Sequence, residues 1–287
     1  MIVYIASYPR SGNFWLQSLL GNQFQRVTTN IHEGQSKPDI LEQWTRSRKR
    51  LFNIDVQPLS TDKNVQYGEL SDWMVSYKSP EEETAHKGIL PGCLGSLNKM
   101  EIRDILAKDQ EYYFLKTHFL PHNNYLEGEY VVQIVRNPGA VLWSYYNFKR
   151  DMRKEYDQDL TSFIHKGKNG TPWEGWSEYH VRWTRASKEL KSRYMLIRYE
   201  DLFGKELEFC EDLQHFLGLT VQSKELKKFE FYHKIRPALS REGKAKGWEE
   251  NYSKQQMRLL WSTHQQMMSR FGYPEPNYEM GNDSTLY

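Results

Sequence analysis

The sequence predicts an α/β domain in which helices flank a central, mainly parallel sheet. Three observations lead to this prediction. Short apolar runs rich in β-branched and aromatic residues recur along the chain, and each is followed by a loop and a helical pattern. Strand and helix patterns alternate from the first residues onward, which is typical of parallel sheets. The chain has 287 residues, enough to bury a sizeable core in one domain, and it shows neither a repeat nor a low-complexity stretch.

The elements follow from these runs in chain order. Core strands are predicted at Val3–Ala6, Tyr112–Lys116, Tyr130–Val135 and Tyr194–Ile197. Helices are predicted at 13–24, 138–149, 201–218, 223–232 and 253–270. Two segments, 32–100 and 151–178, do not fit the alternation and are interpreted as insertions that shape a substrate site or lid, or as plain surface loops. The core is therefore expected at 2–30, 110–150 and 190–273, with a loose tail at 274–287.

Composition excludes several classes of protein. Lys and Arg total 39 against 37 for Asp and Glu, so the net charge of +2 does not predict nucleic-acid or membrane-surface binding. The two cysteines, Cys93 and Cys210, lie far apart and lack C-x-x-C spacing. This spacing argues against both a disulfide framework and a zinc site. The apolar run Ile2 to Ala6 is too short for a signal peptide, and no stretch of about 18 apolar residues follows it. We expect a soluble, cytoplasmic protein.

The segment "SYPRSGNFW" (7–15) joins the first strand to the first helix. A strand that runs through a short loop into a helix directs main-chain N–H groups and the positive end of the helix dipole at one point, which favours phosphate binding. The domain is therefore predicted to be P-loop-like. Gly12 is followed by Asn13 rather than by the Lys and hydroxyl residue of a Walker motif, so a magnesium-dependent NTPase or kinase is disfavoured. The alternative is a structural turn in which Ser11 or Asn13 caps the helix.

Two more segments follow predicted strands. "RNPGAVLWSYYNF" (136–148) places Arg136 at the carboxyl end of a strand and Ser144 on the next helix, a combination suited to a second phosphate. The alternative is a structural ion pair of Arg136 and a packing role for Ser144. "KTHFLP" (116–121) puts Lys116 and His118 at another strand end, where an imidazole can act as a general base and an ammonium can stabilise negative charge.

Taken together, these motifs resemble the 3′-phosphoadenosine 5′-phosphosulfate (PAPS)-dependent sulfotransferases of the cytosolic type, in particular the bacterial branch that acts on small molecules and natural products. Further similarity lies in "WSEYHVRW", "IRYEDL" and "SREGKAKGW", in the same order as in that family. The resemblance spans most of residues 2–273 and is weakest across 32–100. It implies transfer of a sulfuryl group to an acceptor and release of adenosine 3′,5′-bisphosphate (PAP), without a metal.

The resemblance also implies roles for individual residues. The 5′-phosphosulfate would be cradled by Arg10, Ser11, Gly12, Asn13 and Phe14, and Trp15 would stack against adenine. The 3′-phosphate would be held by Arg136, Ser144, Arg241 and Gly243, and the adenine pocket would be lined by Tyr199 and Phe229. His118 would take the acceptor's proton, while Lys116 and Arg10 would balance the charge on the leaving oxygen.

The chain departs from the family pattern at several of these positions. Arg10 stands where many relatives have Lys, and a guanidinium keeps the charge but cannot give up a proton. Phe14 replaces a common Thr, Glu242 a basic residue and Lys246 a Gly. The family's short dimerisation pattern is missing after Trp248, so that dimer is not predicted and the oligomeric state stays open.

For the acceptor, the leading interpretation is a hydroxyl or amine of a small secondary metabolite such as an alkaloid or glycopeptide; phenols or sterols are the alternative. Membrane-anchored carbohydrate sulfotransferases are disfavoured because no anchor is evident. A catalytically silent nucleotide-binding protein and a P-loop kinase represent other classes. The run Glu81 to Glu83 would favour a cationic acceptor if it bordered the site, and is otherwise a solvated face. Several aromatic residues either wall an acceptor pocket or belong to the core or surface: Trp73, Trp173, Trp176, Tyr67, Tyr77, Tyr145 and Tyr146.

Overall fold

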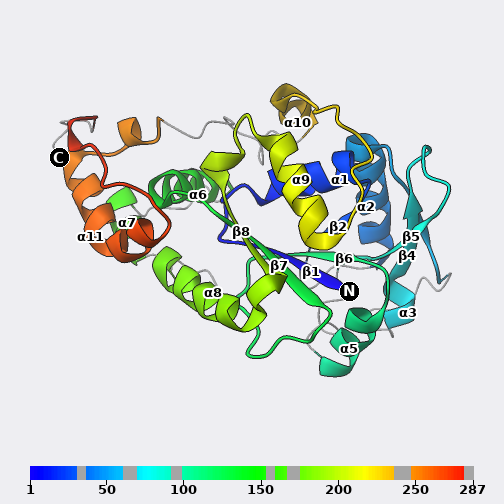
Figure 1. Cartoon of the computed structure of the whole chain (residues 1–287). Helices are drawn as coiled ribbons and strands as arrows, with labels where there is room; N and C mark the ends of the chain where they lie inside the picture. The colour runs from blue at the N-terminus through cyan, green and yellow to red at the C-terminus, as the bar shows by residue number, and fades with distance from the viewer. Residues whose placement is uncertain are drawn as a thin grey trace.

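A five-stranded parallel sheet lies at the centre of the molecule, with strand order β2-β6-β1-β7-β8 (Figure 1). The computed structural model describes residues 1–30, 37–60, 70–91, 99–152, 159–166, 175–235 and 247–280. The strands of this sheet are β1 (Ile2–Ser7), β2 (Thr28–Asn30), β6 (Tyr113–Thr117), β7 (Glu129–Val135) and β8 (Tyr194–Arg198). This architecture confirms the predicted α/β fold class and the four predicted core strands.

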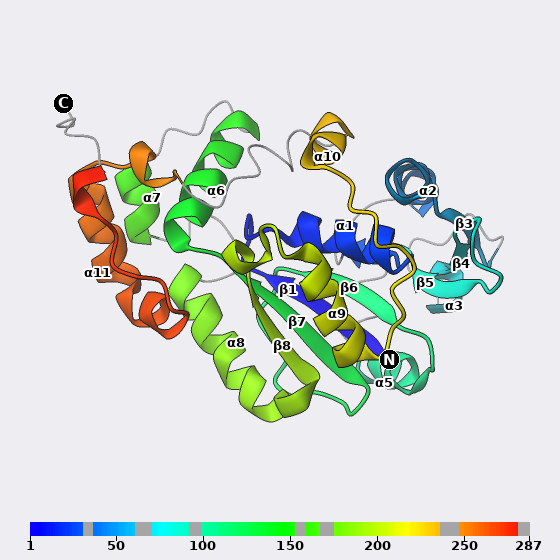
Figure 2. The ribbon, with the colours of Figure 1, turned by 45° about the horizontal axis from the view of Figure 1, so that its top comes forward.

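Helices cover both faces of the sheet. They are α1 (Asn13–Gln23), α2 (Lys37–Phe52), α3 (Leu70–Trp73), α5 (Met100–Lys108), α6 (Pro138–Met152), α7 (Leu160–Lys166), α8 (Trp176–Leu190), α9 (Glu206–Leu217), α10 (Phe229–Ile235) and α11 (Lys254–Arg270). Short 3₁₀ helices are η1 (Lys191–Arg193), η2 (Tyr199–Leu202), η3 (Glu249–Asn251) and η4 (Tyr278–Met280). Figure 2 shows α1 and α9 on one face and α8 on the other. Within the described ranges, no helix is long and apolar enough to cross a membrane.

The sheet separates two hydrophobic cores, because successive side chains of a strand point to opposite faces. On β1, Val3 and Ile5 pack with the core that includes α1 and α9. Ile2 and Tyr4 face the other core, which includes the aromatic side of α8. Both faces of β1 are therefore buried, as expected for the central strand of a parallel sheet.

A second, antiparallel sheet occupies part of the segment that the sequence marked as an insertion at 32–100. Its strands are β3 (Asp55–Pro58), β4 (Met74–Lys78) and β5 (His86–Ile89), in the order β3-β4-β5. Trp73 and Tyr77 are each only 2% exposed and belong to the same core as α8. Of the two interpretations of these aromatic residues, the core assignment is correct.

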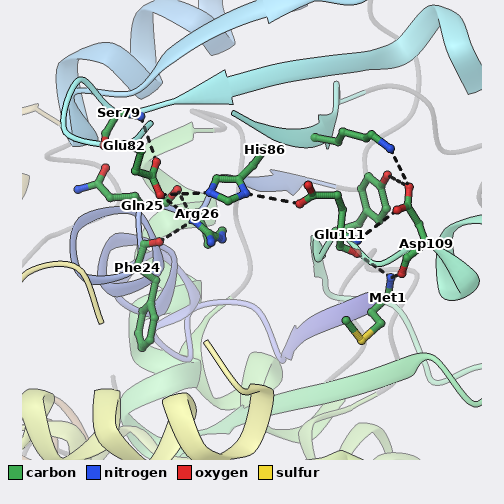
Figure 3. A network of polar contacts seen from close by, with 11 residues as sticks. Met1, Phe24, Gln25, Arg26, Ser79, Glu82, His86, Asp109 and Glu111 are labelled. Carbon is green, nitrogen blue, oxygen red and sulfur yellow. Dashed lines mark hydrogen bonds and ion pairs between the residues drawn. The ribbon is translucent and has the colours of Figure 1, made fainter. Parts of the chain in front are cut away.

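The acidic run at 81–83 is structural or solvated. Glu82 accepts a hydrogen bond from the main-chain N–H of Ser79 and forms ion pairs with Arg26 at 3.1 Å and with His86 at 3.2 Å, as Figure 3 shows. The other ring nitrogen of His86 lies 3.5 Å from a carboxylate oxygen of Glu111, which precedes β6. Glu81 and Glu83 are exposed to solvent. Glu82 thus joins the small sheet to Arg26, which lies between α1 and β2.

Two predicted helices differ from the observed ones. The predicted helix 201–218 is interrupted because Gly204 adopts a left-handed conformation with φ of +75°, so η2 ends before α9 begins. The predicted helix 223–232 is wrong over its first half, and α10 begins only at Phe229. There the chain runs past the end of α1, where the main-chain N–H groups of Gln222 and Ser223 donate to the carbonyl of Gln23. These tertiary hydrogen bonds override local helix propensity.

Candidate active site

The candidate site lies where the parallel strands end. The loops that follow Ser7, Thr117, Val135 and Arg198 all leave the carboxyl edge of the sheet, because β1, β6, β7 and β8 run parallel. Open α/β sheets bind ligands at this edge. The three segments singled out from the sequence therefore meet in space, although more than a hundred residues separate the first from the last.

The turn between β1 and α1 presents an open helix end. Gly12 is the N-cap of α1, and no side chain of the described residues caps this helix. The side chain of Asn13 instead donates to the carbonyl of Ile5 and to Oγ of Ser7. The structural alternative, in which Ser11 or Asn13 caps the helix, is therefore wrong. The first N–H groups of α1 are the donors that a bound anion would satisfy.

Ser11 adds a buried polar atom to this turn. Its side chain is 0% exposed, and its Oγ has no hydrogen-bond partner among the described residues. A buried hydroxyl without a partner is costly, so such a group commonly marks the place of a ligand or water. Together with the uncapped helix, Ser11 gives the turn the donors that a phosphate or phosphosulfate group requires.

Two left-handed residues shape the turn. Arg10 has φ of +69° and Gly12 has φ of +98°. A Cβ on Gly12 would lie 2.3 Å from Cδ2 of the Tyr199 ring, a contact that real Cβ atoms do not make. Glycine is therefore required at position 12 both for its conformation and for the approach of Tyr199. Tyr199 is accordingly placed directly against the turn.

The side chain of Arg136 is hydrogen-bonded to the main chain of Arg10, which brings two cationic residues together at the turn. Nε of Arg10 donates to Oγ of Ser144 at 3.2 Å, and its guanidinium lies 5.0 Å from the centre of the Phe148 ring. Nη1 of Arg136 donates to the carbonyl of Arg10 at 3.2 Å, and its guanidinium lies 4.4 Å from the centre of the Tyr199 ring. The structure thus brings together the turn, the start of α6 and the end of β8.

His118 is held in one orientation beside the turn. Its Nδ1 lies 2.7 Å from the carbonyl oxygen of Ser7, the last residue of β1. A carbonyl oxygen can only accept, so Nδ1 carries the proton and the neutral ring has its basic lone pair on Nε2. Since Asn13 also donates to Oγ of Ser7, the imidazole is fixed to the same framework as the turn.

Lys116 supplies a third cation at this edge. On β6 it pairs in register with Ile5 of β1 and shares a face with Phe114, which packs in the core beneath α1. Burial lowers the pKa of its ammonium group to about 8, because the charged form loses hydration. A bound anion would favour the charged ammonium group and raise this pKa again. Lys116 is therefore suited to stabilise negative charge in the site.

The aromatic residues of the turn contact α10. The ring centres of Trp15 and Tyr232 lie 5.5 Å apart in an edge-on arrangement, and Phe14 also meets Tyr232 edge-on at 6.2 Å. The hydroxyl of Tyr232 accepts a hydrogen bond from Asn22 of α1 at 2.6 Å. Phe229 begins α10, so this predicted position lies on the helix that packs against Trp15. Arg241 and Gly243 lie outside the described residues.

Three residues at this edge were not anticipated from the sequence: Ser7, Glu200 and Tyr232. Ser7 acts through its carbonyl group, which every residue type provides, so no side-chain signal could reveal it. Glu200 directly follows Tyr199 in "IRYEDL", and its carboxylate accepts from the main-chain N–H of Asn137 at 2.9 Å. Tyr232 lies one helical turn after Phe229, a spacing that could have suggested a shared face.

Of the other aromatic candidates that the structure describes, two are buried in the core and one is partly buried. Tyr145 is 5% exposed and Trp176 is 0% exposed, and both pack in the core beside α8. Tyr146 is partly buried against the same core and stacks on Trp143. Trp173 and Tyr67 lie outside the described residues. In the part of the chain that the structure describes, no group of three or more His, Cys, Asp or Glu side chains is placed to hold a metal ion.

The fold and the residues at the carboxyl edge of the parallel sheet define a class of protein. It is an α/β protein with a P-loop-like turn between β1 and α1. The sulfotransferase domain family matches residues 2–272, nearly the whole length. The chain therefore belongs to the sulfotransferase family. This finding confirms the family that the sequence motifs predict.

Curated relatives agree with this membership over shorter stretches. Carbohydrate sulfotransferase 1 of Danio rerio is 25% identical over 173 residues, which cover 50% of this chain and 37% of that protein. Carbohydrate sulfotransferase 1 of Rattus norvegicus is 31% identical over 104 residues, which cover 32% of this chain and 24% of that protein. The matched stretches thus span only about a quarter to about two fifths of the relatives' own length.

Solved structures share the fold. A mouse sulfotransferase complexed with PAP has a TM-score of 0.50 at 13% identity, covering 92% of this chain and 84% of that one. Retinol dehydratase in complex with androsterone and PAP has a TM-score of 0.51 at 17% identity, covering 93% and 80%. At these identities, the likeness establishes the α/β fold.

Proposed function

We propose that this protein transfers a sulfuryl group from PAPS to a hydroxyl or amine of a small acceptor and releases PAP. The observation that carries the proposal is the meeting of four features beside one turn: the open N-terminus of α1, the buried hydroxyl of Ser11, the cation Arg10 with Arg136 bonded to its main-chain carbonyl, and an oriented His118. Both solved sulfotransferase-fold proteins named above were crystallised with PAP, which supports the choice of nucleotide.

The residues divide into three groups in this proposal. Arg10, Ser11, Gly12, Asn13 and Phe14 would bind the 5′-phosphosulfate, chiefly through main-chain N–H groups. The 3′-phosphate would lie with Arg136 and Ser144, joined by Arg241 and Gly243. Trp15, Tyr199 and Phe229 would contact the adenine. An anion placed there would satisfy Ser11 Oγ and the open end of α1.

The chemistry follows from the side chains that surround the turn. Nε2 of His118 would take the proton from the acceptor as the bond to sulfur forms and the bond to the bridging oxygen breaks. The negative charge that develops on that oxygen would be stabilised by Lys116 and by Arg10, since Arg10 keeps its charge but donates no proton. Fixed cations and N–H groups thus provide both positioning and electrostatic stabilisation.

The acceptor proposed first is a small natural product, with a phenol or a sterol as the alternative. Androsterone bound to retinol dehydratase favours the sterol alternative. The matches to carbohydrate sulfotransferase 1 favour a sugar hydroxyl as a further candidate, contrary to the expectation from the sequence. A screen of phenols, sterols, amines and sugars with radiolabelled PAPS would rank these classes by turnover.

The decisive experiment for the donor is calorimetric titration with PAP and with 5′-AMP in buffer that contains EDTA. Micromolar or tighter binding that requires the 3′-phosphate would support the proposal. Equal binding of the two nucleotides, or binding of neither, would contradict it. Turnover of an acceptor with PAPS under the same chelating conditions would then separate a working enzyme from a silent binding protein and from a magnesium-dependent kinase.

A further inference from the structure

The carboxylate of Glu200 joins two parts of the molecule at the edge of the candidate site. Its Oε1 accepts a hydrogen bond from the main-chain N–H of Asn137 at 2.9 Å, and its Oε2 accepts one from the hydroxyl of Tyr273 at 2.8 Å. Tyr273 is buried, with 4% of its surface exposed, and the guanidinium of Arg198 lies 4.8 Å from the centre of its ring. Glu200 is therefore fixed by its hydrogen bond from Tyr273 while its other carboxylate oxygen binds Asn137.

Asn137 is the residue that fixes the start of α6. Its side-chain oxygen accepts from the N–H of Gly139 at 2.9 Å, and its carbonyl accepts from the N–H of Val141. These bonds make Asn137 the cap of the helix, with Pro138 in the first turn. Glu200 binds the remaining polar main-chain group of Asn137, its N–H. The hydrogen bond between Glu200 and Asn137 thus sets the direction of the main chain at Arg136, the preceding residue.

Glu200 and Tyr199 act on the same segment from adjacent positions. The Tyr199 ring lies against Gly12 and beneath the guanidinium of Arg136, while Glu200 binds the peptide group that follows Arg136. A carboxylate only accepts hydrogen bonds, so it has no direct attraction for a phosphate group. Its contribution is geometric, because it keeps Arg136 in contact with the turn.

We infer that Glu200 is a positioning residue for Arg136 and thereby sets the preference of the site for a nucleotide with a 3′-phosphate. This inference rests on the proposed function, in which Arg136 contacts the 3′-phosphate. In this role Glu200 acts on the nucleotide through Arg136 and not by a contact of its own. The chain of contacts runs from Tyr273 through Glu200 and Asn137 to Arg136.

The test compares the affinities for PAP and 5′-AMP, measured by calorimetry, in wild type and variants. Glu200→Ala should weaken PAP binding about tenfold, which corresponds to about 1.4 kcal/mol, and leave 5′-AMP binding unchanged within about twofold. Glu200→Gln should retain wild-type selectivity, because its amide oxygen can accept from Asn137 and its amide nitrogen can donate to Tyr273. Glu208→Ala, which removes an exposed carboxylate on α9, is the matched control.

The outcomes separate this inference from the proposed function. If wild type prefers PAP and Glu200→Ala loses that preference while Glu200→Gln keeps it, the positioning role is supported. If Glu200→Ala keeps the full preference, or weakens both nucleotides equally, the positioning role is overturned and the proposed function stands. If wild type binds PAP and 5′-AMP equally, the positioning role and the proposed function are both contradicted. Should Glu200→Ala fail to fold, Tyr273→Phe removes the hydrogen bond that fixes the Glu200 carboxylate. Unchanged selectivity for PAP over 5′-AMP in that variant would overturn the positioning role.

Discussion

The carbonyl oxygen of Ser7 lies 2.7 Å from Nδ1 of His118, so the last residue of β1 fixes the tautomer of the imidazole that follows β6. Because the proton is on Nδ1, the lone pair of the neutral ring is on Nε2. This bond comes from the backbone and persists whatever side chain stands at position 7. The orientation of His118 is thus tied to the pairing of β1 with β6.

Replacing His118 with Ala should abolish sulfuryl transfer while leaving the donor site in place. General-base catalysis contributes about 10²–10⁴-fold, so kcat should fall by at least about a hundredfold. Affinity for PAP should change by less than about twofold. Measurements of turnover and of PAP binding on the same preparation check this prediction. The control is His215→Ala, at an exposed histidine of α9, and a parallel loss of binding and turnover in the His118 variant would contradict the assignment.

Gly12→Ala should disrupt the phosphate-binding turn more than an alanine at another left-handed glycine. Both Gly12 and Gly204 have positive φ, but a Cβ at Gly12 would meet the Tyr199 ring at 2.3 Å, whereas one at Gly204 would meet no atom of the described residues within 4 Å. Left-handed strain costs about 1–2 kcal/mol in either case. The steric conflict with the Tyr199 ring adds to this strain only at Gly12.

The Gly12 variant should therefore weaken PAP binding by more than about tenfold, and the Gly204 variant should bind PAP as wild type does. Thermal melting measures the shared strain, and calorimetry measures the difference in affinity. Similar affinities for PAP in the two variants would show that the contact between Tyr199 and Gly12 is not needed for binding.

PAP binding near pH 8 should draw a proton onto Lys116. Burial lowers the pKa of this ammonium group to about 8, so a large fraction of the side chain is neutral at that pH in the free protein. A bound anion favours the charged form and raises this pKa. The affinity gained from Lys116 is thus complete well below pH 8 and declines as pH rises through the pKa of the free protein.

Calorimetry at pH 8 in two buffers with different ionisation enthalpies would detect the uptake, which should approach about half a proton per site. Lys116→Met should remove the proton uptake and weaken binding. Lys116→Arg should remove the uptake and keep much of the affinity, since a guanidinium does not titrate in this range. Uptake that persists in both variants would assign the proton to another group.

Strands β1, β6 and β7 could be predicted because they are buried on both faces and appear as continuous apolar runs, such as Tyr130–Val135. The smaller sheet could not, because β3 to β5 are short and include polar and charged residues such as Asp55 and Lys87. Propensity also failed at 223–228, which form no helix; at their start, the main-chain N–H groups of Gln222 and Ser223 donate to the carbonyl of Gln23.

For the candidate site, sequence patterns identified the side chains that carry charge or flexibility, including Arg10, Gly12, Arg136 and His118. They did not identify the contacts that orient these residues. The Ser7 carbonyl is a backbone group, and the Glu200 carboxylate acts on a peptide N–H that is remote in sequence. Such contacts depend on the register of parallel strands, which the pattern of a single strand does not determine.

Two histidines in the core between α8 and α11 should make the protein sensitive to acid. His180 is 0% exposed and His264 is 3% exposed, and Trp176 lies between them with ring centres at 4.7 Å and 5.6 Å. Nδ1 of His180 contacts Gln133 at 3.0 Å, and Nδ1 of His264 contacts Ser177 at 2.8 Å. Burial lowers the pKa of His180 to about 3 and that of His264 to about 4.

The sign of the effect follows from these pKa values. Below about pH 6.5, the unfolded chain binds protons at both histidines, whereas the folded protein does not until the pH approaches 4. The free energy of unfolding should therefore fall with decreasing pH, by at most about 1.4 kcal/mol per pH unit for each histidine. Urea unfolding between pH 7 and pH 5 measures this slope. His264→Leu should make the slope shallower, and an identical slope in this variant would mean that His264 is protonated equally in both states.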